Sequence, residues 1–327
     1  MNSDARHQGV VIPLHGDPAL ADRAATRRRP RPGTGEQAEV YPLGTGAEAA
    51  LAVRPGSPWE RRAAGALDFL QRRLTGDYAV DRYGYDEDLT ESVALPTLRA
   101  LYRRWFRVEV NGIANVPSSG GALLVANHAG GIWPFDAAMT AVAVHDEHPA
   151  RRTLRLLASS RVFATPVVGT LARRTGSTLA CTPDAEGLLR GGELVGTFPE
   201  GLAGIGKHFR DRYELQPFGS AVFVDAAMSA GVPIVPVSIV GAEEIHPVLG
   251  RARTLARVLN VPYVPLTPTF PWLGALGLVP LPSKWYIEFG DPIATDGIGR
   301  DELTDRVRET IQTTLYRLLV QRRSVWR

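Results

Sequence analysis

The chain has 327 residues, and its 37 Lys and Arg against 34 Asp and Glu give a formal net charge of +3. Basic residues are scattered among acidic ones, so the charge pattern does not indicate a nucleic-acid-binding protein. A single cysteine, Cys181, excludes an intramolecular disulfide and is compatible with a reducing compartment. No clustered spacing of Cys and His indicates a metal site, and we expect no bound metal.

The N-terminal segment, residues 1–50, is rich in Pro, Gly, Ala and Arg and shows no sustained apolar periodicity. This composition predicts a disordered tail, followed by a single α/β domain over residues 51–327. The tail lacks the apolar core of a secretory signal, so export is not indicated.

Two amphipathic helices are predicted next, over residues 59–74 and 95–106. Both combine arginines with aromatic residues, a composition that is found on anionic membrane surfaces. The simpler alternative is that each helix packs its apolar face on a sheet. We expect packing along most of each helix and membrane contact at one end.

Apolar strands then alternate with helical stretches along the chain. This alternation predicts an α/β fold with a mixed, largely parallel sheet flanked by helices. Near the C-terminus, apolar residues at positions 303, 307, 311 and 315 predict a helix with one buried stripe. The expected strands cover residues 121–126, 154–157, 194–198, 234–240 and 285–289.

Residues 258–283 contain no charged side chain, which by length alone is compatible with a transmembrane segment. Six prolines exclude a continuous helix there. We expect a loop or broken hairpin that presents Tyr263, Phe270, Trp272 and Leu276 to a bilayer interface, with burial against the protein's own core as the alternative. In both cases the chain lies on a membrane and does not span it.

Asn127 and His128 follow the apolar strand 121–126, and Asp136 opens the next helical stretch. A histidine at a strand end and an aspartate at the following helix start can meet across a turn. A carboxylate that accepts the Nδ1 proton fixes the tautomer and leaves Nε2 free as a general base. Taken alone, Asp136 would be a helix N-cap, and it can serve both purposes.

Two further segments have the same setting at strand ends. Phe198-Pro199-Glu200-Gly201 ends one apolar run, and Val232-Pro233-Ile234-Val235-Pro236-Val237 forms another. Loops at strand ends are where an open α/β sheet keeps its site. In this order, the three segments resemble the motifs of the glycerolipid acyltransferase family, which includes the lysophosphatidate acyltransferases.

The resemblance implies an O-acyltransferase. It would move a fatty acyl group from acyl-CoA or acyl-ACP to a hydroxyl of a glycerolipid, such as a lysophospholipid or 1-acylglycerol-3-phosphate, without a further cofactor. It implies that His128 is the general base, oriented by Asp136, and that Glu200 and Gly201 shape the acceptor site. Asn127 and Pro233 belong to the matching motifs and are counted with the substrate-binding residues. Backbone amides near Gly130 and Gly131 are expected to stabilise the oxyanion.

The chain departs from the family pattern in three places. Seven residues separate His128 from Asp136 where the family has four, and Thr182 and Ala203 stand where the family has arginines that grip the acceptor's phosphate. Their loss puts lysophosphatidate in doubt as the acceptor. Lys207, Arg210 and Arg212 either replace that charge or form a solvated basic loop. We include Lys207 and Arg210 among the predicted substrate-binding residues.

Two alternatives stay open at this point. One is the same chemistry on a neutral acceptor, such as diacylglycerol or another alcohol. The other is a non-catalytic, membrane-associated lipid-binding protein in which His128 and Asp136 are separated. For the enzyme we expect a thioester donor (carried by coenzyme A or acyl carrier protein), a lipid acceptor and a membrane surface as partners, no nucleic acid, and peripheral attachment to the cytoplasmic face of a membrane.

Overall fold

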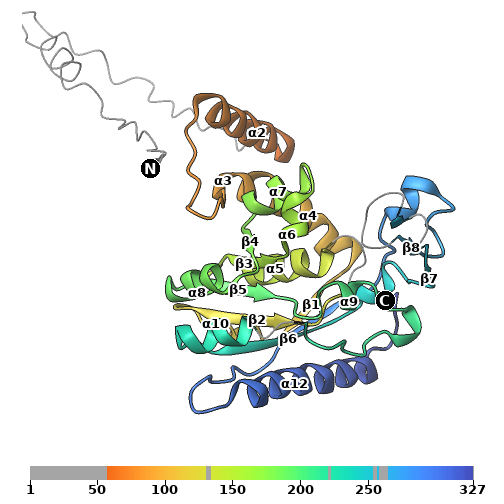
Figure 1. Ribbon diagram of the computed structural model, residues 1–327. Coiled ribbons are helices and arrows are strands. Elements are labelled where there is room, and N and C mark those ends of the chain that lie inside the picture. The colour runs from red at the N-terminus through yellow and green to blue at the C-terminus, as the bar shows by residue number, and fades with distance from the viewer. Residues whose placement is uncertain (1–56, 130–133, 220–221, 253–255, 258–263, 327) are drawn as a thin grey trace, which may run out of the picture. The chain divides into compact units, whose positions relative to one another are not determined.

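The main sheet contains seven strands in the order β1-β9-β6-β2-β5-β3-β4 (Figure 1). The computed structural model describes residues 57–326 except for 130–133, 220–221, 253–255 and 258–263. Neighbouring strands are parallel except for β6 and β9, which are antiparallel. The predicted mixed, largely parallel sheet is confirmed. Its strands are β1 (Glu109–Asn111), β2 (Ala122–Ala126), β3 (Leu154–Ala158), β4 (Ser177–Leu179), β5 (Leu194–Thr197), β6 (Ile234–Val240) and β9 (Tyr286–Phe289).

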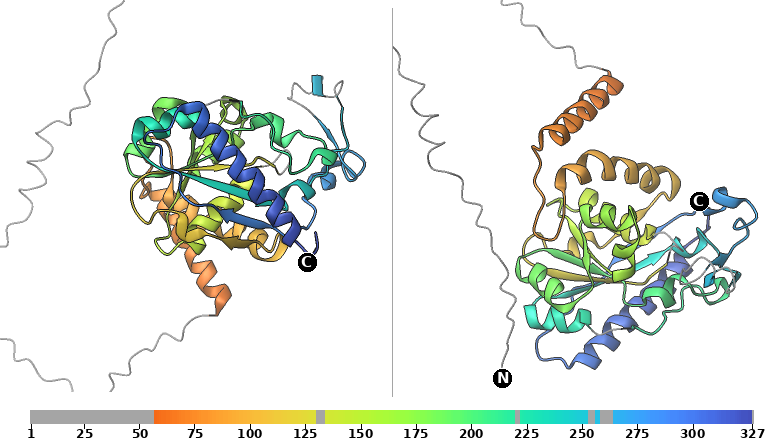
Figure 2. Two further views of the ribbon diagram at one scale, coloured as in Figure 1. Left: turned by 90° about the horizontal axis from the view of Figure 1, so that it is seen from below. Right: turned by 45° about the horizontal axis from the view of Figure 1, so that its top comes forward.

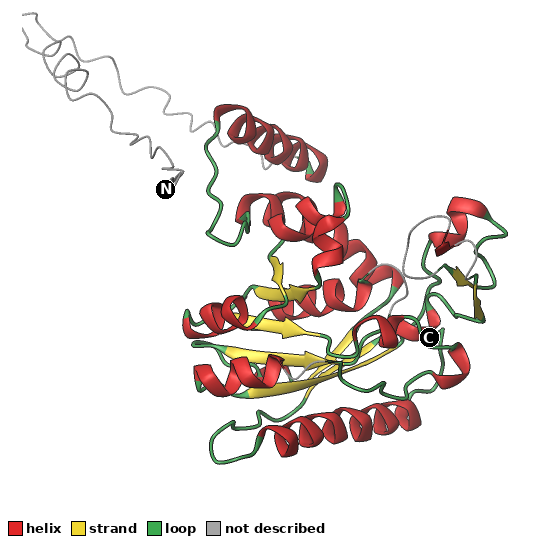
Figure 3. Ribbon diagram, viewed as in Figure 1, coloured by secondary structure: helices red, strands yellow, loops and turns green. Residues whose placement is uncertain are grey.

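Helices cover both faces of this sheet (Figure 3). α4 (Leu95–Ala100), the π-helical turn η2 (Leu101–Trp105) and α5 (Phe135–Glu147) lie on one face. α8 (Thr182–Arg190), α10 (Val222–Ala230) and α12 (Arg300–Gln321) lie on the other, where α12 crosses the sheet diagonally (Figure 2). With both faces covered, the central strands are largely apolar and do not alternate regularly with polar residues.

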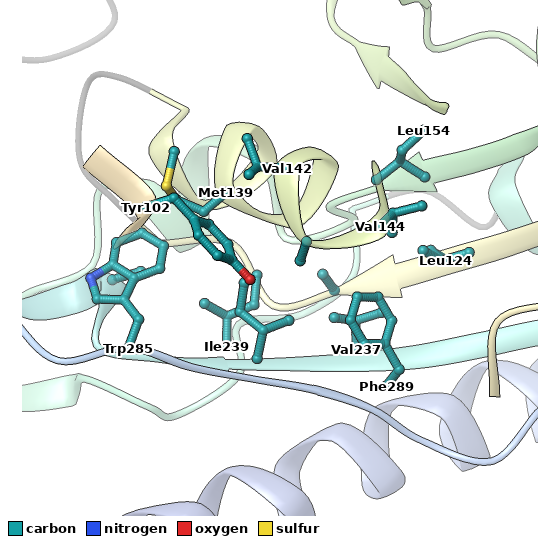
Figure 4. Packing of buried hydrophobic residues seen from close by; sticks show 14 of the residues in the cluster. Tyr102, Leu124, Met139, Val142, Val144, Leu154, Val237, Ile239, Trp285 and Phe289 are labelled. Carbon is teal, nitrogen blue, oxygen red and sulfur yellow. The ribbon is translucent and has the colours of Figure 1, made fainter. Parts of the chain in front are cut away.

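Strand β2 shows how side chains divide between the two layers. Leu124 packs on the α4 and α5 side, whereas Leu123 and Val125 pack on the α8, α10 and α12 side. Successive residues of a strand point to opposite faces, so one short apolar run supplies both cores. Met139, Tyr102 and Trp285 fill the first layer (Figure 4).

The C-terminal helix α12 buries the stripe that its four-residue spacing predicts. Leu303, Val307, Ile311 and Leu315 are all fully buried, and Leu318 continues the stripe. The α12 side of the sheet is thereby closed by one long helix.

The first described helix, α2 (Pro58–Thr75), departs from expectation. Ser57 caps its start and accepts a hydrogen bond from the amide of Glu60, and Gly76 ends it in a left-handed conformation. Its apolar residues Trp59, Leu67 and Leu74 are exposed. The expectation that this helix packs most of its apolar face on the sheet is therefore wrong. The second predicted helix does pack, because Leu95, Tyr102 and Phe106 are buried.

The uncharged segment after β6 is described from residue 264 onward. Strand β8 (Pro265–Leu266) pairs with β7 (Gly250–Arg251), and the 3-10 turn η6 (Gly274–Leu278) follows. Trp272 and Leu276 are exposed, Phe270 is half-buried, and Tyr263 lies outside the described residues. Among the helices in the described ranges, none is long and apolar enough to cross a membrane.

Residues Gly56–Arg327 form one compact unit. The predicted tail, residues 1–50, lies outside the described part of the chain, so its expected disorder stays a prediction. The remaining helices and turns are α3 (Glu87–Leu89), η1 (Thr90–Ala94), η3 (Ile113–Asn115), α6 (Ser160–Ala164), α7 (Val168–Arg174), α9 (Gly201–Ile205), η4 (Phe209–Asp211) and η5 (Ala242–Glu244).

Parallel pairing sets the position of the site. Val125 of β2 lies opposite Thr197 of β5, and Ala126 lies opposite Val237 of β6. The chain therefore leaves β2, β5 and β6 at the same edge of the sheet, which we call the carboxyl edge. All three following loops meet there.

Candidate active site

His128 and Asp136 meet at the carboxyl edge. The Nδ1 atom of His128 lies 2.6 Å from Oδ2 of Asp136, although seven residues separate them in sequence. The Asp136 carboxylate also accepts the backbone N–H groups of Ala129 at 2.7 Å and Ala137 at 2.8 Å. A fully buried carboxylate with three donors has its orientation fixed, and as an acceptor it places the imidazole proton on Nδ1.

Asp136 is not the N-cap that its position suggests. Helix α5 begins at Phe135 and its N-cap is Pro134, so Asp136 lies in the first turn. Its carboxylate is occupied with the loop that carries His128. Of the two roles considered for this residue, only the orienting one fits the geometry.

The imidazole of His128 is partly open. Its side chain is 16% exposed, whereas the Asp136 side chain is 0% exposed. The ring centroid lies 5.0 Å from that of Phe198, which leads into the second motif. Within the described residues, Nε2 makes no hydrogen bond to the protein, so this nitrogen is free to accept a proton from a bound molecule.

The carboxylate of Glu200 contacts the main chain of His128. Its Oε1 accepts the backbone N–H of His128 at 2.7 Å, and its Oε2 accepts the backbone N–H of Gln216 at 2.7 Å. The residue is buried. Both oxygens are therefore bound to main-chain donors, and the expected contact of Glu200 with an acceptor is replaced by support of the His128 loop.

Helix α9 touches this loop directly. A Cβ atom at Gly204 would lie 2.7 Å from the carbonyl oxygen of His128, so only glycine fits there. Gly201 starts α9 at a φ of +52°, a conformation that favours glycine. The two glycines let the second motif approach the first.

Lys207 points into the protein, which corrects its predicted role. Its Nζ lies 3.4 Å from Oε2 of Glu200, 3.1 Å from Oε1 of Glu243 and 3.0 Å from the carbonyl oxygen of Glu214. An ammonium group has three N–H donors, and all three are used. Since its side chain is only 5% exposed, Lys207 is not available to bind an acceptor's phosphate.

Arg210 and Arg212 lie on the surface of the same loop. Arg210 is 82% exposed and pairs with its neighbour Asp211 at 3.2 Å. Arg212 donates to the carbonyl oxygen of Phe209 and lies over its ring. This arrangement corresponds to the solvated basic loop that was the alternative to a phosphate site.

Asn127 and Pro233 both make hydrogen bonds that join β2 to β6. The side chain of Asn127 is buried, accepts the N–H of Ile239 at 2.7 Å and donates to its carbonyl at 3.0 Å, so it joins β2 to β6. Pro233 precedes β6, and its carbonyl accepts the N–H of Leu123 at the start of β2. Pro233 therefore lies at the opposite edge of the sheet from His128. Asn127 has no free polar atom to offer a substrate.

Glu243 belongs to the site and was missed. Its Oε1 accepts from Lys207 and from the backbone N–H of Tyr213 at 3.0 Å. Burial raises the pKa of Glu243 to about 7, although Lys207 opposes that shift. The sequence held a signal, because this carboxylate follows strand β6 as Glu200 follows β5 and both leave the same edge.

Two other expectations concern the oxyanion and metal binding. Gly130 and Gly131, whose amides were expected to stabilise an oxyanion, lie outside the described residues. Within the described ranges, no group of three or more His, Cys, Asp or Glu side chains could hold a metal ion.

Comparison with known proteins gives the family. Residues 107–240, which include His128, Asp136 and Glu200, match the family model described as Acyltransferase. The chain belongs to the acyltransferase family. The resemblance noted from the motifs is thereby confirmed, and the protein is an acyltransferase enzyme.

Relatives of this acyltransferase occur in mycobacteria. The uncharacterized protein Rv0502 of Mycobacterium tuberculosis is 48% identical over 97% of this chain and 96% of its own length. The uncharacterized protein ML2427 of Mycobacterium leprae is 55% identical over 83% of this chain and 76% of its own length. A crystal structure of the 1-acyl-sn-glycerophosphate (LPA) acyltransferase PlsC from Thermotoga maritima aligns with a TM-score of 0.49 and 19% identity, covering 81% of this chain and 99% of that chain.

Proposed function

We propose that this acyltransferase moves a fatty acyl group from a thioester to the hydroxyl of a glycerolipid, with His128 as the general base. The observation that carries the proposal is the His128–Asp136 pair, whose 2.6 Å hydrogen bond engages Nδ1, while Nε2 has no hydrogen bond to the described part of the protein. The non-catalytic alternative required that these two residues be separated. The pair is intact, which argues for the enzyme.

The proposed step is a direct transfer. Nε2 of His128 takes the hydroxyl proton as the acceptor oxygen attacks the thioester carbonyl, and Asp136 stabilises the imidazolium that forms. The tetrahedral intermediate then collapses with cleavage of the C–S bond. The proton passes from Nε2 to the departing sulfur, so the products are an ester and a free thiol. Coenzyme A and acyl carrier protein both supply such a thioester.

The placement of the basic residues bears on the acceptor. Thr182 and Ala203 provide no guanidinium, Lys207 is fully engaged inside the protein, and Arg210 is paired at the surface. A phosphate monoester is bound best by paired, charge-assisted hydrogen bonds. The arrangement therefore favours a lysophospholipid with a phosphodiester, or a neutral acceptor such as diacylglycerol, over lysophosphatidate.

We also propose that the protein attaches peripherally to the cytoplasmic face of a membrane. Trp272 is 76% exposed and Leu276 is 73% exposed, in a segment without charged residues. This segment borders a basic turn, because the indole N–H of Trp105 donates to the carbonyl of Pro280, and Arg103 and Arg104 beside it are exposed. Tryptophan next to arginine suits the boundary of an anionic lipid layer.

The test is transfer by the purified protein. Labelled acyl-CoA and acyl-ACP are each offered with lysophosphatidate, a phosphodiester lysophospholipid and diacylglycerol in mixed micelles, and labelled ester is measured. We expect ester formation that depends on His128, with the latter two acceptors preferred. Absence of transfer from both donors to every acceptor would overturn the proposed function, and stoichiometric lipid binding in its place would support the binding-protein alternative.

A further inference from the structure

Three ionisable side chains form a buried cluster behind His128. Glu200, Lys207 and Glu243 have side-chain exposures of 0%, 5% and 6%, and Lys207 lies between the two carboxylates. They come from the loop after β5 and from η5 after β6.

We propose that Lys207 and Glu243 are positioning residues for acyl transfer, since they hold Glu200 in the place where it fixes the main chain of His128. This inference rests on the proposed function of His128. It assigns to the loop after β5 a task that differs from contact with the acceptor.

Charge ties Lys207 to both carboxylates. Two buried carboxylates share one ammonium group, and a buried charge is tolerated only when it is paired and hydrogen-bonded. Without the ammonium, Glu200 and Glu243 would both lack their counter-charge. One of them would then take up a proton or turn away, because two like charges in one buried site disfavour joint ionisation.

Glu200 in turn fixes the main chain of His128. Glu200 gives one oxygen to the N–H of His128 and the other to the N–H of Gln216, which are short bonds of 2.7 Å each. If Glu200 is protonated or turned, the His128 main chain loses one of its supports. Catalytic groups are sensitive to such changes, since a shift of about 1 Å can reduce a rate about a hundredfold.

Neighbouring charges are already satisfied. Tyr213 donates its amide to Glu243, while its hydroxyl donates to Glu244. Glu244 is bound by Arg322 at 2.7 Å. Arg322, the neighbouring cation, is therefore paired with Glu244 and does not pair with Glu200 or Glu243 in place of Lys207.

The experiment compares a single and a double variant of the full chain with wild type. Lys207→Met should lower kcat about tenfold or more while KM changes less than about threefold. Adding Glu243→Gln to Lys207→Met removes the second carboxylate, so the double variant should regain kcat at least about threefold over the single one. A double variant that is no better than Lys207→Met would overturn the proposal, because loss of packing alone is not relieved by a second change.

The pH dependence gives a second readout. Relative to wild type, kcat of Lys207→Met should fall threefold or more between pH 6 and pH 8, because rising pH ionises Glu243, whose pKa is raised by burial, beside Glu200 without a counter-charge. The double variant should keep a constant ratio, and a constant ratio for Lys207→Met as well would contradict the inference.

Lys284 provides the matched control. It is a half-buried lysine just before β9, bound to Glu109 of β1 at 2.6 Å and to a main-chain carbonyl. Lys284→Met, alone and with Glu109→Gln, should keep kcat within about twofold and show no rescue. If Lys207→Met does not fold, Lys207→Gln takes its place, since it retains an N–H donor inside the cluster.

Amide hydrogen exchange separates this inference from the proposed function. In Lys207→Met the amide of His128 should exchange at least about tenfold faster than in wild type, and the double variant should restore part of the protection. If wild type transfers no acyl group, the proposed function fails, and unchanged exchange in Lys207→Met would overturn the positioning role independently.

Discussion

Two segments each place a buried carboxylate against His128, yet the carboxylates make different contacts. The first segment, called here the first loop, is the loop after β2 together with the start of α5. The second, called the second loop, is the loop after β5. Asp136 binds the imidazole at 2.6 Å, whereas Glu200 binds the backbone N–H of the same residue at 2.7 Å. Among the described residues, the first contact leaves Nε2 of His128 without a hydrogen bond to the protein. The second loop turns its carboxylate and its lysine inward.

This difference shows that a charged residue near a sequence motif does not by itself indicate a ligand-binding residue. Lys207 and Arg210 are three residues apart, but one is buried among acceptors and the other is solvated. Burial and partners decide which of them can meet a substrate. Both loops contact His128, one through its side chain and the other through its backbone.

The largest effect is expected at the first loop. His128→Ala should lower kcat about a hundredfold or more, because the other groups bound to Asp136 are backbone amides, which cannot act as a base. Asp136→Asn should also cause a large loss, because an amide does not enforce the imidazole tautomer. Label transfer from acyl-CoA measures both. Asp225→Asn, also in the first turn of a helix and paired with Arg300, is the control. Folded variants with near-normal turnover would show that the base is misassigned.

The buried cluster of Glu200, Lys207 and Glu243 should respond to pH through Glu243. Its pKa is raised to about 7 in the folded protein from an ordinary value of 4.5, so the folded state holds the proton more tightly. The associated stability is present below pH 4.5 and is lost as the pH rises through 7. Glu243→Gln lacks this loss, and its free energy of unfolding relative to wild type should increase by about 3 kcal/mol between pH 4.5 and pH 8. Denaturant titration at both pH values measures it; a constant difference would contradict the raised pKa.

Glu200→Gln tests the support of the backbone directly. The amide keeps one oxygen for the His128 N–H, but its NH₂ group faces the Gln216 N–H and Lys207 in place of an acceptor. We expect kcat to fall about tenfold, less than for Asp136→Asn, with little change in KM. Steady-state kinetics over a range of acceptor concentrations distinguishes the two constants. A rise in KM with unchanged kcat would instead support a contact between Glu200 and the acceptor.

Much of the architecture follows from local pattern. Apolar runs of four to seven residues predict β2, β5 and β6, and the four-residue spacing predicts the buried stripe of α12. The three-residue strands β1 and β4 are too short to produce such a pattern. The pairing of His128 with Asp136 follows from a strand, a turn and a helix in succession, so it too is encoded within ten residues.

The remaining features depend on distant parts of the chain. Lys207 turns inward because Glu243, 36 residues further on, meets it at 3.1 Å. Pro233 was grouped with the site by its motif, but parallel register places the start of β6 at the far edge. The apolar stripe of α2 is exposed although its periodicity is that of a packed helix, since periodicity does not tell which surface covers it.

The exposed apolar segment allows a test of how lipid reaches the two loops. Trp272→Ala with Leu276→Ala should weaken binding to anionic liposomes about tenfold, because each side chain loses burial in the lipid interface. Cosedimentation measures the bound fraction. Tyr316→Ala with Val320→Ala, which removes two exposed residues of α12, is the matched control. Equal binding by all three proteins would exclude the segment as a membrane contact, and resistance to alkaline extraction would indicate an integral anchor.

The smallest effect is expected for the solvated end of the second loop. Arg210→Ala with Arg212→Ala removes two surface cations, and exposed ion pairs contribute little. We therefore expect the ratio of turnover with lysophosphatidate to turnover with a phosphodiester lysophospholipid to change less than about threefold. A paired, charge-assisted contact to phosphate would be worth far more, about 1.5–3 kcal/mol for each hydrogen bond. A strong lysophosphatidate preference that the double substitution destroys would show that these arginines do bind the acceptor, and that the second loop supports the base at its buried end and binds phosphate at its exposed one.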